Sequence, residues 1–257
     1  MIESETTGLS KAEVIVINDE GIGEAEIEMI PAEQDLVFVV NSTVEARFCC
    51  APHRVKALVA GWLVGEGIIE TGADVLALET DLISARVDIT LSDACFKKLQ
   101  SRVDTTTTPV IGETSFGAKT DTILELDHEG VESLARNFRQ LFLSLKSAER
   151  MCYLSSIATS ADILTYGEGF HRINSFYRAM GEMVRNNQDQ EGKIALMNFG
   201  LSRVLVSKLA RAGIAMAICF APPTSSAIDL ANDYYVSIIC ASNGQGTRVY
   251  SAPWRVI

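Results

Sequence analysis

Three apolar runs in the C-terminal half constrain the fold more than any other feature. They cover residues 194–199, 214–220 and 235–240, and a helix-like pattern separates each pair. Strands that are apolar throughout and joined by helices are typical of a parallel sheet covered on both faces. Ligands of such sheets bind beyond the carboxyl ends of the strands. Those ends are residues 198–202, 221–226 and 241–246.

The N-terminal half mixes strand and helix patterns. Alternation over residues 36–50 predicts a hairpin that turns at residues 41–43. Apolar positions at helical spacing predict an amphipathic helix that starts with Pro52 as a first helical residue and stops at Gly65. The remaining predicted elements are a strand at 84–91, a short helix at 92–99 capped by Ser92, a long surface loop at 105–120 and a helix at 131–150.

Size and patterning predict two lobes in an α/β protein. The chain has 257 residues, and single cores tend to stop growing near ~250 residues. We place the boundary near Gly130. Residues 1–129 then form an α+β lobe with the amphipathic helix and the Thr-rich loop, and residues 130–257 form an αβα lobe.

Charge and hydropathy exclude some classes of binding partner and indicate a cellular compartment. A net charge of −11 argues against nucleic acid and anionic membranes, which select basic faces. No apolar run approaches the ~18 residues of a membrane span, and the acidic N-terminus lacks an export signal. Six cysteines at irregular spacing, three of them (Cys49, Cys219 and Cys240) in apolar runs, favour free thiols in a reducing cytoplasm.

Short catalytic signatures are missing from the sequence. It contains no GxGxxG, no GxxxxGK[ST], no HExxH and no CxxC, and the last absence argues against zinc deaminase chemistry. Gly200 and Ser202 begin a GxSxG nucleophile elbow, but Val204 stands in place of its second glycine, and we interpret Ser202 as a helix N-cap. We therefore assign no catalytic residue and expect no tightly bound metal.

Among the three histidines, His171 is the first choice for mutation. It stands beside Glu168 and Arg172 in a segment that resembles a glycine-bearing turn, where these groups could orient an imidazole or hold an anion. His53, at the start of the first helix, and His128, in a turn-like segment, are expected to be structural or solvated. A hydrolase that uses His171 and Glu168 is one hypothesis.

The loops at the strand ends are the candidate ligand site. The hydroxyls of Thr224, Ser225 and Ser226 either cap the following helix or belong to a phosphate-binding helix terminus. The segment Ser242, Asn243, Gly244, Gln245 and Gly246 is either a hairpin turn or a polar loop that contacts a nucleotide.

Several stretches resemble the formate dehydrogenase accessory proteins (FdhD/NarQ family) in matching order over residues 35–257. The matching stretches are residues 50–52, 58–63, 66–69, 208–214, 221–227 and 249–250. The resemblance implies a fold similar to cytidine deaminase, with a three-layer αβα lobe and a smaller N-terminal α+β lobe. It also implies sulfur transfer from a cysteine desulfurase to the molybdenum bis-guanine-dinucleotide cofactor of formate dehydrogenase, and it leaves a homodimer open.

The reactive residues of that family are mostly replaced here. Its CxxC would fall within residues 105–117, which contain no cysteine. Its EDVGRHN motif corresponds to residues 168–174 and retains Glu168, Arg172 and Asn174, while the counterpart of its arginine-bearing loop, residues 241–246, has no arginine. By resemblance and position, the cofactor-binding candidates are Glu168, Arg172, Asn174, Thr224, Ser225 and residues 242–246.

Two functions follow from the resemblance. One is a sulfurtransferase-like carrier in which Cys49, Cys50 or Cys152 replaces the missing pair. The other is a catalytically silent relative that binds a guanine nucleotide, the cofactor or a partner enzyme without sulfur transfer.

Overall fold

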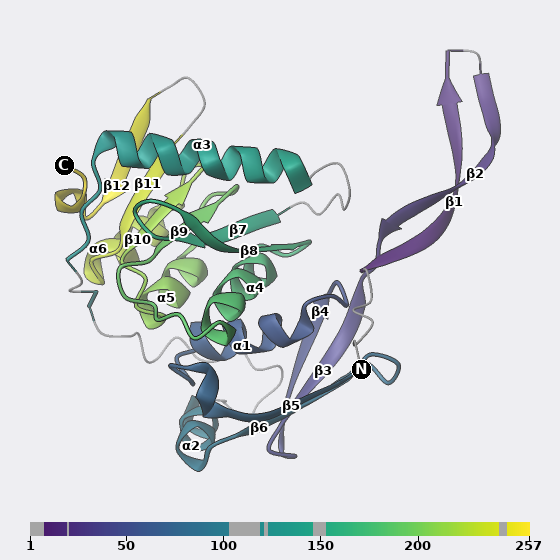
Figure 1. Cartoon of the computed structure of the whole chain (residues 1–257), viewed down its shortest axis with the longest axis horizontal. Coiled ribbons are helices and arrows are strands. Elements are labelled where there is room, and N and C mark those ends of the chain that lie inside the picture. Colours follow the sequence, from purple (N-terminus) through teal and green to yellow (C-terminus); the bar gives the residue numbers. More distant parts are fainter. Residues whose placement is uncertain (1–7, 20, 103–118, 121–122, 146–152, 242–245) are drawn as a thin grey trace.

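A six-stranded sheet forms the larger part of the molecule (Figure 1). The computed structural model describes residues 8–19, 21–102, 119–120, 123–145, 153–241 and 246–257. The strand order is β12-β11-β10-β9-β7-β8. The strands are β7 (Tyr153–Ala158), β8 (Ile163–Gly169), β9 (Ile194–Met197), β10 (Met216–Cys219), β11 (Ser237–Ala241) and β12 (Thr247–Ser251).

The three predicted apolar strands are confirmed as β9, β10 and β11. They pair in parallel, and every residue of β9 and β10 is buried, because helices cover both faces of the sheet. Helix α3 (His128–Leu145) covers one face, and α4 (Arg172–Arg185), α5 (Arg203–Arg211) and α6 (Ser225–Asp233) cover the other (Figure 1). This αβα arrangement confirms the predicted α/β class, whereas the likeness to cytidine deaminase stays a prediction.

The strand directions bring four carboxyl ends to one edge of the sheet. Both β8 and β9 run antiparallel to β7, so β8 runs parallel to β9. The edge formed by the ends of β8, β9, β10 and β11 is called the carboxyl edge below. Helix α4 begins three residues after β8 ends, at Arg172, so its N-terminus lies at this edge.

A second sheet has the order β4-β3-β6-β5. Its strands are β3 (Gln34–Val40), β4 (Val44–Cys50), β5 (Val75–Asp81) and β6 (Arg86–Leu91), followed by α2 (Asp93–Arg102). The β3–β4 hairpin is confirmed, and its turn places Asn41 and Ser42 at positive φ. The capping role of Ser92 is confirmed too, since its hydroxyl accepts a hydrogen bond from the Cys95 amide at 3.4 Å.

Helix α1 (Val55–Gly65) joins the two sheets by packing against α4. Gly61 and Gly181 allow the contact: a Cβ on Gly61 would lie 1.7 Å from the Tyr177 carbonyl oxygen, and one on Gly181 would lie 1.8 Å from that of Ala57. One continuous apolar core therefore runs from the smaller sheet to the larger one. The prediction that Pro52 opens this helix is wrong, because the left-handed Arg54 is the N-cap.

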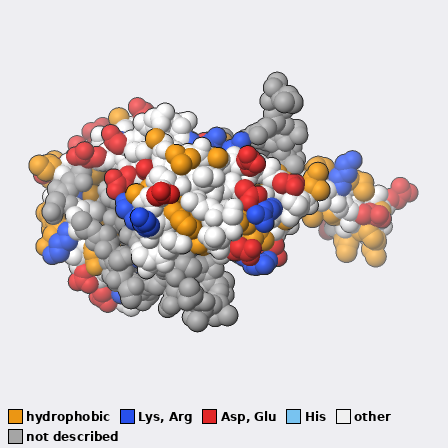
Figure 2. Space-filling model, turned by 90° about the horizontal axis from the view of Figure 1, so that it is seen from below, with side chains coloured by type: hydrophobic (Ala, Val, Ile, Leu, Met, Phe, Trp, Pro, Cys, Tyr) orange, Lys and Arg blue, Asp and Glu red, His pale blue; other side chains and the backbone are white. Residues whose placement is uncertain are grey.

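A long hairpin projects from the body of the molecule (Figure 1). It consists of β1 (Leu9–Asn18) and β2 (Gly21–Pro31), paired antiparallel. Its side chains are mostly exposed, including Ile17 at 75% and Ile22 at 77%. Figure 2 shows hydrophobic and acidic side chains side by side on this projection. The sequence pattern did not predict these strands.

Two segments that the sequence predicts as turns belong to regular elements. Residues 166–169, predicted as part of a turn, belong to β8, and His128, also predicted in a turn, begins α3. The Thr-rich loop is described only at residues 119–120, and the end of the helix predicted to reach residue 150 lies outside the described residues. The boundary at residues 129/130 stays a prediction. None of the helices that the structure describes is long and apolar enough to cross a membrane.

Candidate thiol site at the carboxyl edge

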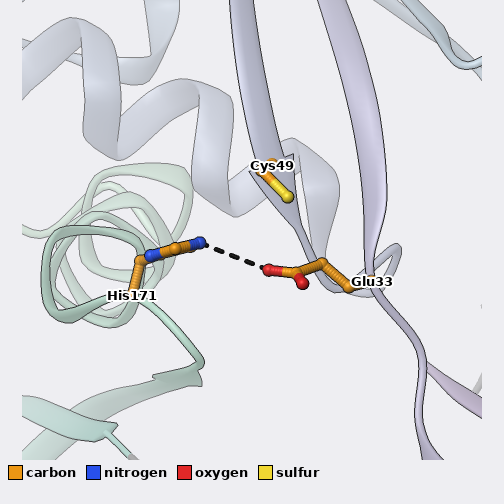
Figure 3. A group of neighbouring side chains, drawn as sticks. All are labelled: Glu33, Cys49 and His171. Carbon is orange, nitrogen blue, oxygen red and sulfur yellow. Dashed lines mark ion pairs between the residues drawn. The ribbon is translucent and has the colours of Figure 1, made fainter.

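Three side chains from separate segments meet where α4 begins (Figure 3). Glu33 precedes β3, Cys49 lies on β4, and His171 is the N-cap residue of α4. Their oxygen, sulfur and nitrogen atoms all lie within 4.8 Å of one another, and His171 Nε2 pairs with Glu33 Oε1 at 3.2 Å. All three side chains are exposed. We call this group the Cys49 cluster.

The strand register adds a second carboxylate to the Cys49 cluster. Asp35 is directly opposite Cys49 in the β3–β4 pair, so both side chains point to the same face of the sheet. Desolvation, hydrogen bonds with Glu33 and Asp35, and their negative charges raise the pKa of Cys49 to about 12. The thiol is therefore protonated at neutral pH unless a base or a cation assists it.

The backbone of Cys49 is tied to helix α4. Asn174 donates a hydrogen bond from Nδ2 to the Cys49 carbonyl oxygen at 2.9 Å, and the Asn174 side chain is buried. The predicted binding residue Asn174 thus holds the strand that carries the thiol. This contact fixes the distance between β4 and the start of α4.

Arg178 links the segments below the cluster. Its guanidinium, which is fully buried, donates to the carbonyl oxygens of Ala51 at 2.7 Å, Glu168 at 2.9 Å and His53 at 3.2 Å. Desolvation lowers the pKa of Arg178. Buried donors in such number hold β8, α4 and the loop after β4 in one arrangement.

Cys50 is the buried neighbour of Cys49. It is 1% exposed, and burial raises its pKa to about 11, although the Arg178 guanidinium acts in the opposite direction. Because successive strand residues face opposite sides, Cys49 faces solvent while Cys50 faces the core. Of the free cysteines in the described residues, Cys49 alone is exposed. Cys152 lies outside the described residues.

Glu168 pairs with His53 and not with His171. His53 Nε2 lies 2.8 Å from Glu168 Oε1, and Arg54 Nη1 lies 3.3 Å from Glu168 Oε2. Burial alone would raise the pKa of Glu168, but the hydrogen bond from His53 and the charges around it, Arg54 first, lower it. The expectation that Glu168 would orient His171 in a turn is therefore wrong, because Glu168 belongs to β8, is buried and pairs with His53 and Arg54.

The other predicted ligand residues lie along the carboxyl edge. Arg172 is exposed, and its guanidinium carbon lies 5.3 Å from the Tyr153 ring centroid and 5.7 Å from that of Phe199, just beyond β9. The Thr224 hydroxyl accepts a hydrogen bond from the Ala227 amide at 3.3 Å as N-cap of α6, and Ser225 begins that helix. The Ser202 hydroxyl caps α5 in the same way. Residues 242–245 lie outside the described residues, and Gly246 precedes β12.

A second pair of thiols lies inside the sheet. Cys219 and Cys240 are opposite each other at the ends of β10 and β11, and both are buried. The hydrogen bond between them and burial raise the pKa of Cys219, and the same hydrogen bond lowers the pKa of Cys240. Burial keeps this pair from a large partner, so Cys49 remains the accessible thiol of the described residues.

The site combines features that the sequence brought together only in part. The sequence points to Cys49, His171, Arg172 and Asn174, but it does not place Glu33 near a thiol. The alternation of β3 and β4 could have pointed to Asp35, because a hairpin with its turn at residues 41–43 places Asp35 opposite Cys49.

Fold and site define an α/β protein with a mixed six-stranded sheet and a thiol at its carboxyl edge, where a smaller sheet lies next to it. Comparison with known proteins is consistent with the resemblance found in the sequence. The model of the FdhD/NarQ family matches residues 31–257, and the chain belongs to this family.

Individual relatives match along most of their length. The sulfur carrier protein FdhD of Shouchella clausii is 21% identical over 238 residues, which cover 88% of this chain and 89% of the relative. The protein of the same name from Burkholderia mallei is 26% identical over 227 residues, covering 81% and 83%. A crystal structure described as a candidate formate dehydrogenase accessory protein from Desulfotalea psychrophila superposes with a TM-score of 0.75 at 17% identity. The superposition covers 97% of this chain and 100% of the chain in that crystal structure.

Proposed function

We propose that this chain is an accessory protein of a formate dehydrogenase and carries sulfur to the molybdenum bis-guanine-dinucleotide cofactor of that enzyme. The observation that carries the proposal is the exposed Cys49 thiol at the carboxyl edge, in a chain whose relatives are named sulfur carrier proteins. That name favours sulfur transfer over a role limited to binding. Cys49 takes the place of the CxxC pair that residues 105–117 lack.

Loading of Cys49 is a thiol–persulfide exchange. The Cys49 sulfur attacks the terminal sulfur of a persulfide on a cysteine desulfurase, the donor S–S bond breaks, and the desulfurase thiolate leaves. The Cys49 proton must depart in the same step because the raised pKa keeps the thiol protonated. Glu33 and Asp35 form hydrogen bonds with the thiol and can accept its proton, and His171, paired with Glu33 at 3.2 Å, can relay it. The leaving thiolate is the final proton acceptor.

Release of the sulfur as sulfide requires two electrons. A small-molecule thiol that attacks the Cys49 sulfur of the persulfide supplies them: it forms a mixed disulfide with Cys49 and expels hydrosulfide toward the cofactor. A second thiol then reduces the disulfide and regenerates Cys49. These reaction steps do not require a second cysteine within the site.

The carboxyl edge offers donors for an anionic dinucleotide. Arg172 lies exposed at the start of α4, next to His171 of the Cys49 cluster, and its guanidinium suits phosphate recognition. The N-termini of α5 and α6 follow β9 and β10 at the same edge and favour negative charge. Because the chain carries a net charge of −11, binding would depend on these local donors.

Mass spectrometry of the loaded protein tests the thiol assignment. The chain is incubated with a cysteine desulfurase and isotopically labelled cysteine and then digested with trypsin, which releases residues 48–54 as one peptide. We expect one added sulfur on Cys49 in this peptide, loss of the added sulfur in Cys49→Ser, and retention in Cys95→Ser, whose sulfur is buried away from the site. Unmodified Cys49 in the intact chain, or sulfur only on Cys152, would refute the assignment.

A further inference from the structure

The donor atoms of the Cys49 cluster are those of a transition-metal site. Thiolate, imidazole and carboxylate are the three ligand types that Zn²⁺ accepts, whereas Ca²⁺ and Mg²⁺ select oxygen alone. Here one of each comes from a different segment, with all donor atoms within 4.8 Å of one another. A bound zinc ion would draw these atoms to metal–ligand distances of about 2.0–2.3 Å.

Two of the three ligands, Cys49 and His171, have fixed backbone positions although their side chains are exposed. Cys49 is held by the register of β3 and β4 and by the hydrogen bond from Asn174 to its carbonyl oxygen. The His171 carbonyl oxygen accepts the Ser175 amide at 3.1 Å as the first turn of α4 closes. A cation would thus meet two ligands on ordered elements and a third, Glu33, directly before β3.

Charge at the cluster also favours a cation. Glu33 and Asp35 place two carboxylates next to the Cys49 sulfur, and Cys49 forms hydrogen bonds with both. The side chains of His171 and Glu33 are 52% and 47% exposed, so an ion can reach them from solvent. An ion bound by three protein ligands would keep a fourth position, which water or the Asp35 carboxylate can fill.

We propose that Glu33, Cys49 and His171 bind a divalent transition-metal ion of the zinc type. The thiol proton of Cys49 passes to bulk water when the metal–sulfur bond forms, and no electron is transferred. The ion binds the Cys49 sulfur atom, which the proposed carrier function also uses. It therefore protects Cys49 from alkylation and from sulfur transfer until a chelator or a competing partner removes it.

Titration of the full chain with Co²⁺ tests the site, because a thiolate bound to Co²⁺ gives a near-ultraviolet charge-transfer band. We expect this band when Co²⁺ is added to the metal-free wild-type protein, and its loss when Zn²⁺ then displaces Co²⁺. We expect no band when Co²⁺ is added to Cys49→Ser. The apparent affinity should fall at least about tenfold in His171→Ala and in Glu33→Gln, since removal of a ligand or its support weakens metal sites by that order.

His128→Ala is the matched control, because His128 is exposed at the start of α3 and outside the cluster. It should bind Co²⁺ as the wild type does, and far-ultraviolet circular dichroism should show every variant folded. The absence of a band in the folded wild type, or a band that persists in Cys49→Ser, overturns the metal site.

The outcome is separable from that of the carrier function. Persulfide on Cys49 in a protein that gives no cobalt band would contradict the metal site alone. A cobalt band in a protein that never acquires sulfur on Cys49 would contradict the carrier role alone. If both hold, saturating Zn²⁺ should slow alkylation of Cys49, and a chelator should restore the rate.

Discussion

Replacement of Gly61 by alanine should force helices α1 and α4 apart. The added Cβ would lie 1.7 Å from the Tyr177 carbonyl oxygen, and the nearest three atoms are all backbone atoms of Tyr177, so no side-chain rotation can relieve the overlap. The two helices would have to separate by about 1.5 Å to restore an ordinary contact. That shift acts on Arg178, the next residue of α4, whose guanidinium holds the carbonyl oxygens of Ala51 and His53.

The energetic terms have opposite signs. Alanine is favoured over glycine within a helix by ~1 kcal/mol, while overpacking against a rigid neighbour costs about 1–3 kcal/mol or more. Weakening of the buried Arg178 hydrogen bonds adds about 1.5–3 kcal/mol. A net loss of about 3 kcal/mol corresponds to a fall in Tm of about 6–12 °C for a chain of this size.

Differential scanning calorimetry measures this loss. Gly130→Ala is the matched control, since Gly130 also lies in a helix but its added Cβ would meet mainly the movable Leu126 side chain, at 2.6 Å. The control should melt near the wild type. A Gly61→Ala protein that melts within about 2 °C of the wild type would refute the backbone contact as the joint between the two sheets.

Two substitutions and one labelling experiment probe the charge arrangement. Glu168→Gln should destabilise the protein at neutral pH, and the deficit should shrink as pH falls below 4.5, because a carboxyl with a lowered pKa stabilises the fold only while ionised; urea midpoints at several pH values that keep a constant difference would contradict this. Glu66→Ala should cost about 3–5 kcal/mol in urea unfolding because Lys208 and Arg211 lose their buried carboxylate partner, and a cost below 1 kcal/mol would exclude it. In the native protein Cys49 should be alkylated before any other described thiol, and faster as pH rises toward 12; earlier labelling of a buried thiol would oppose this order.

The parallel sheet could be predicted because its strands carry a local signal. The buried strands at residues 194–197, 216–219 and 237–241 are apolar except for Ser237, and helices with clear caps separate them. The β1–β2 hairpin carries no such signal, since most of its side chains face solvent and no buried face imposes a pattern. Only the pairing of β1 with β2 in the structure reveals this hairpin.

The site was less predictable because its contacts join distant positions. His53 and Glu168 are 115 positions apart, so nearness in sequence favoured the pairing of Glu168 with His171 instead. That pairing fails because Glu168 lies within β8, where it is buried and pairs with His53 and Arg54, whereas His171 lies beyond the strand end and is exposed. Strand alternation predicts that one of Cys49 and Cys50 faces outward without deciding which. The partner Glu33 comes from the loop before β3, for which the pattern gives no placement.

The most direct test of the proposed carrier function follows sulfur into a client enzyme. A cysteine desulfurase, radiolabelled cysteine and this chain are incubated with a formate dehydrogenase whose molybdenum cofactor lacks sulfur, and label in the re-isolated enzyme is counted. We predict label and formate oxidation with the wild-type chain and neither with Cys49→Ser. Equal label in the enzyme with Cys49→Ser, or with no chain added, would contradict sulfur transfer through Cys49.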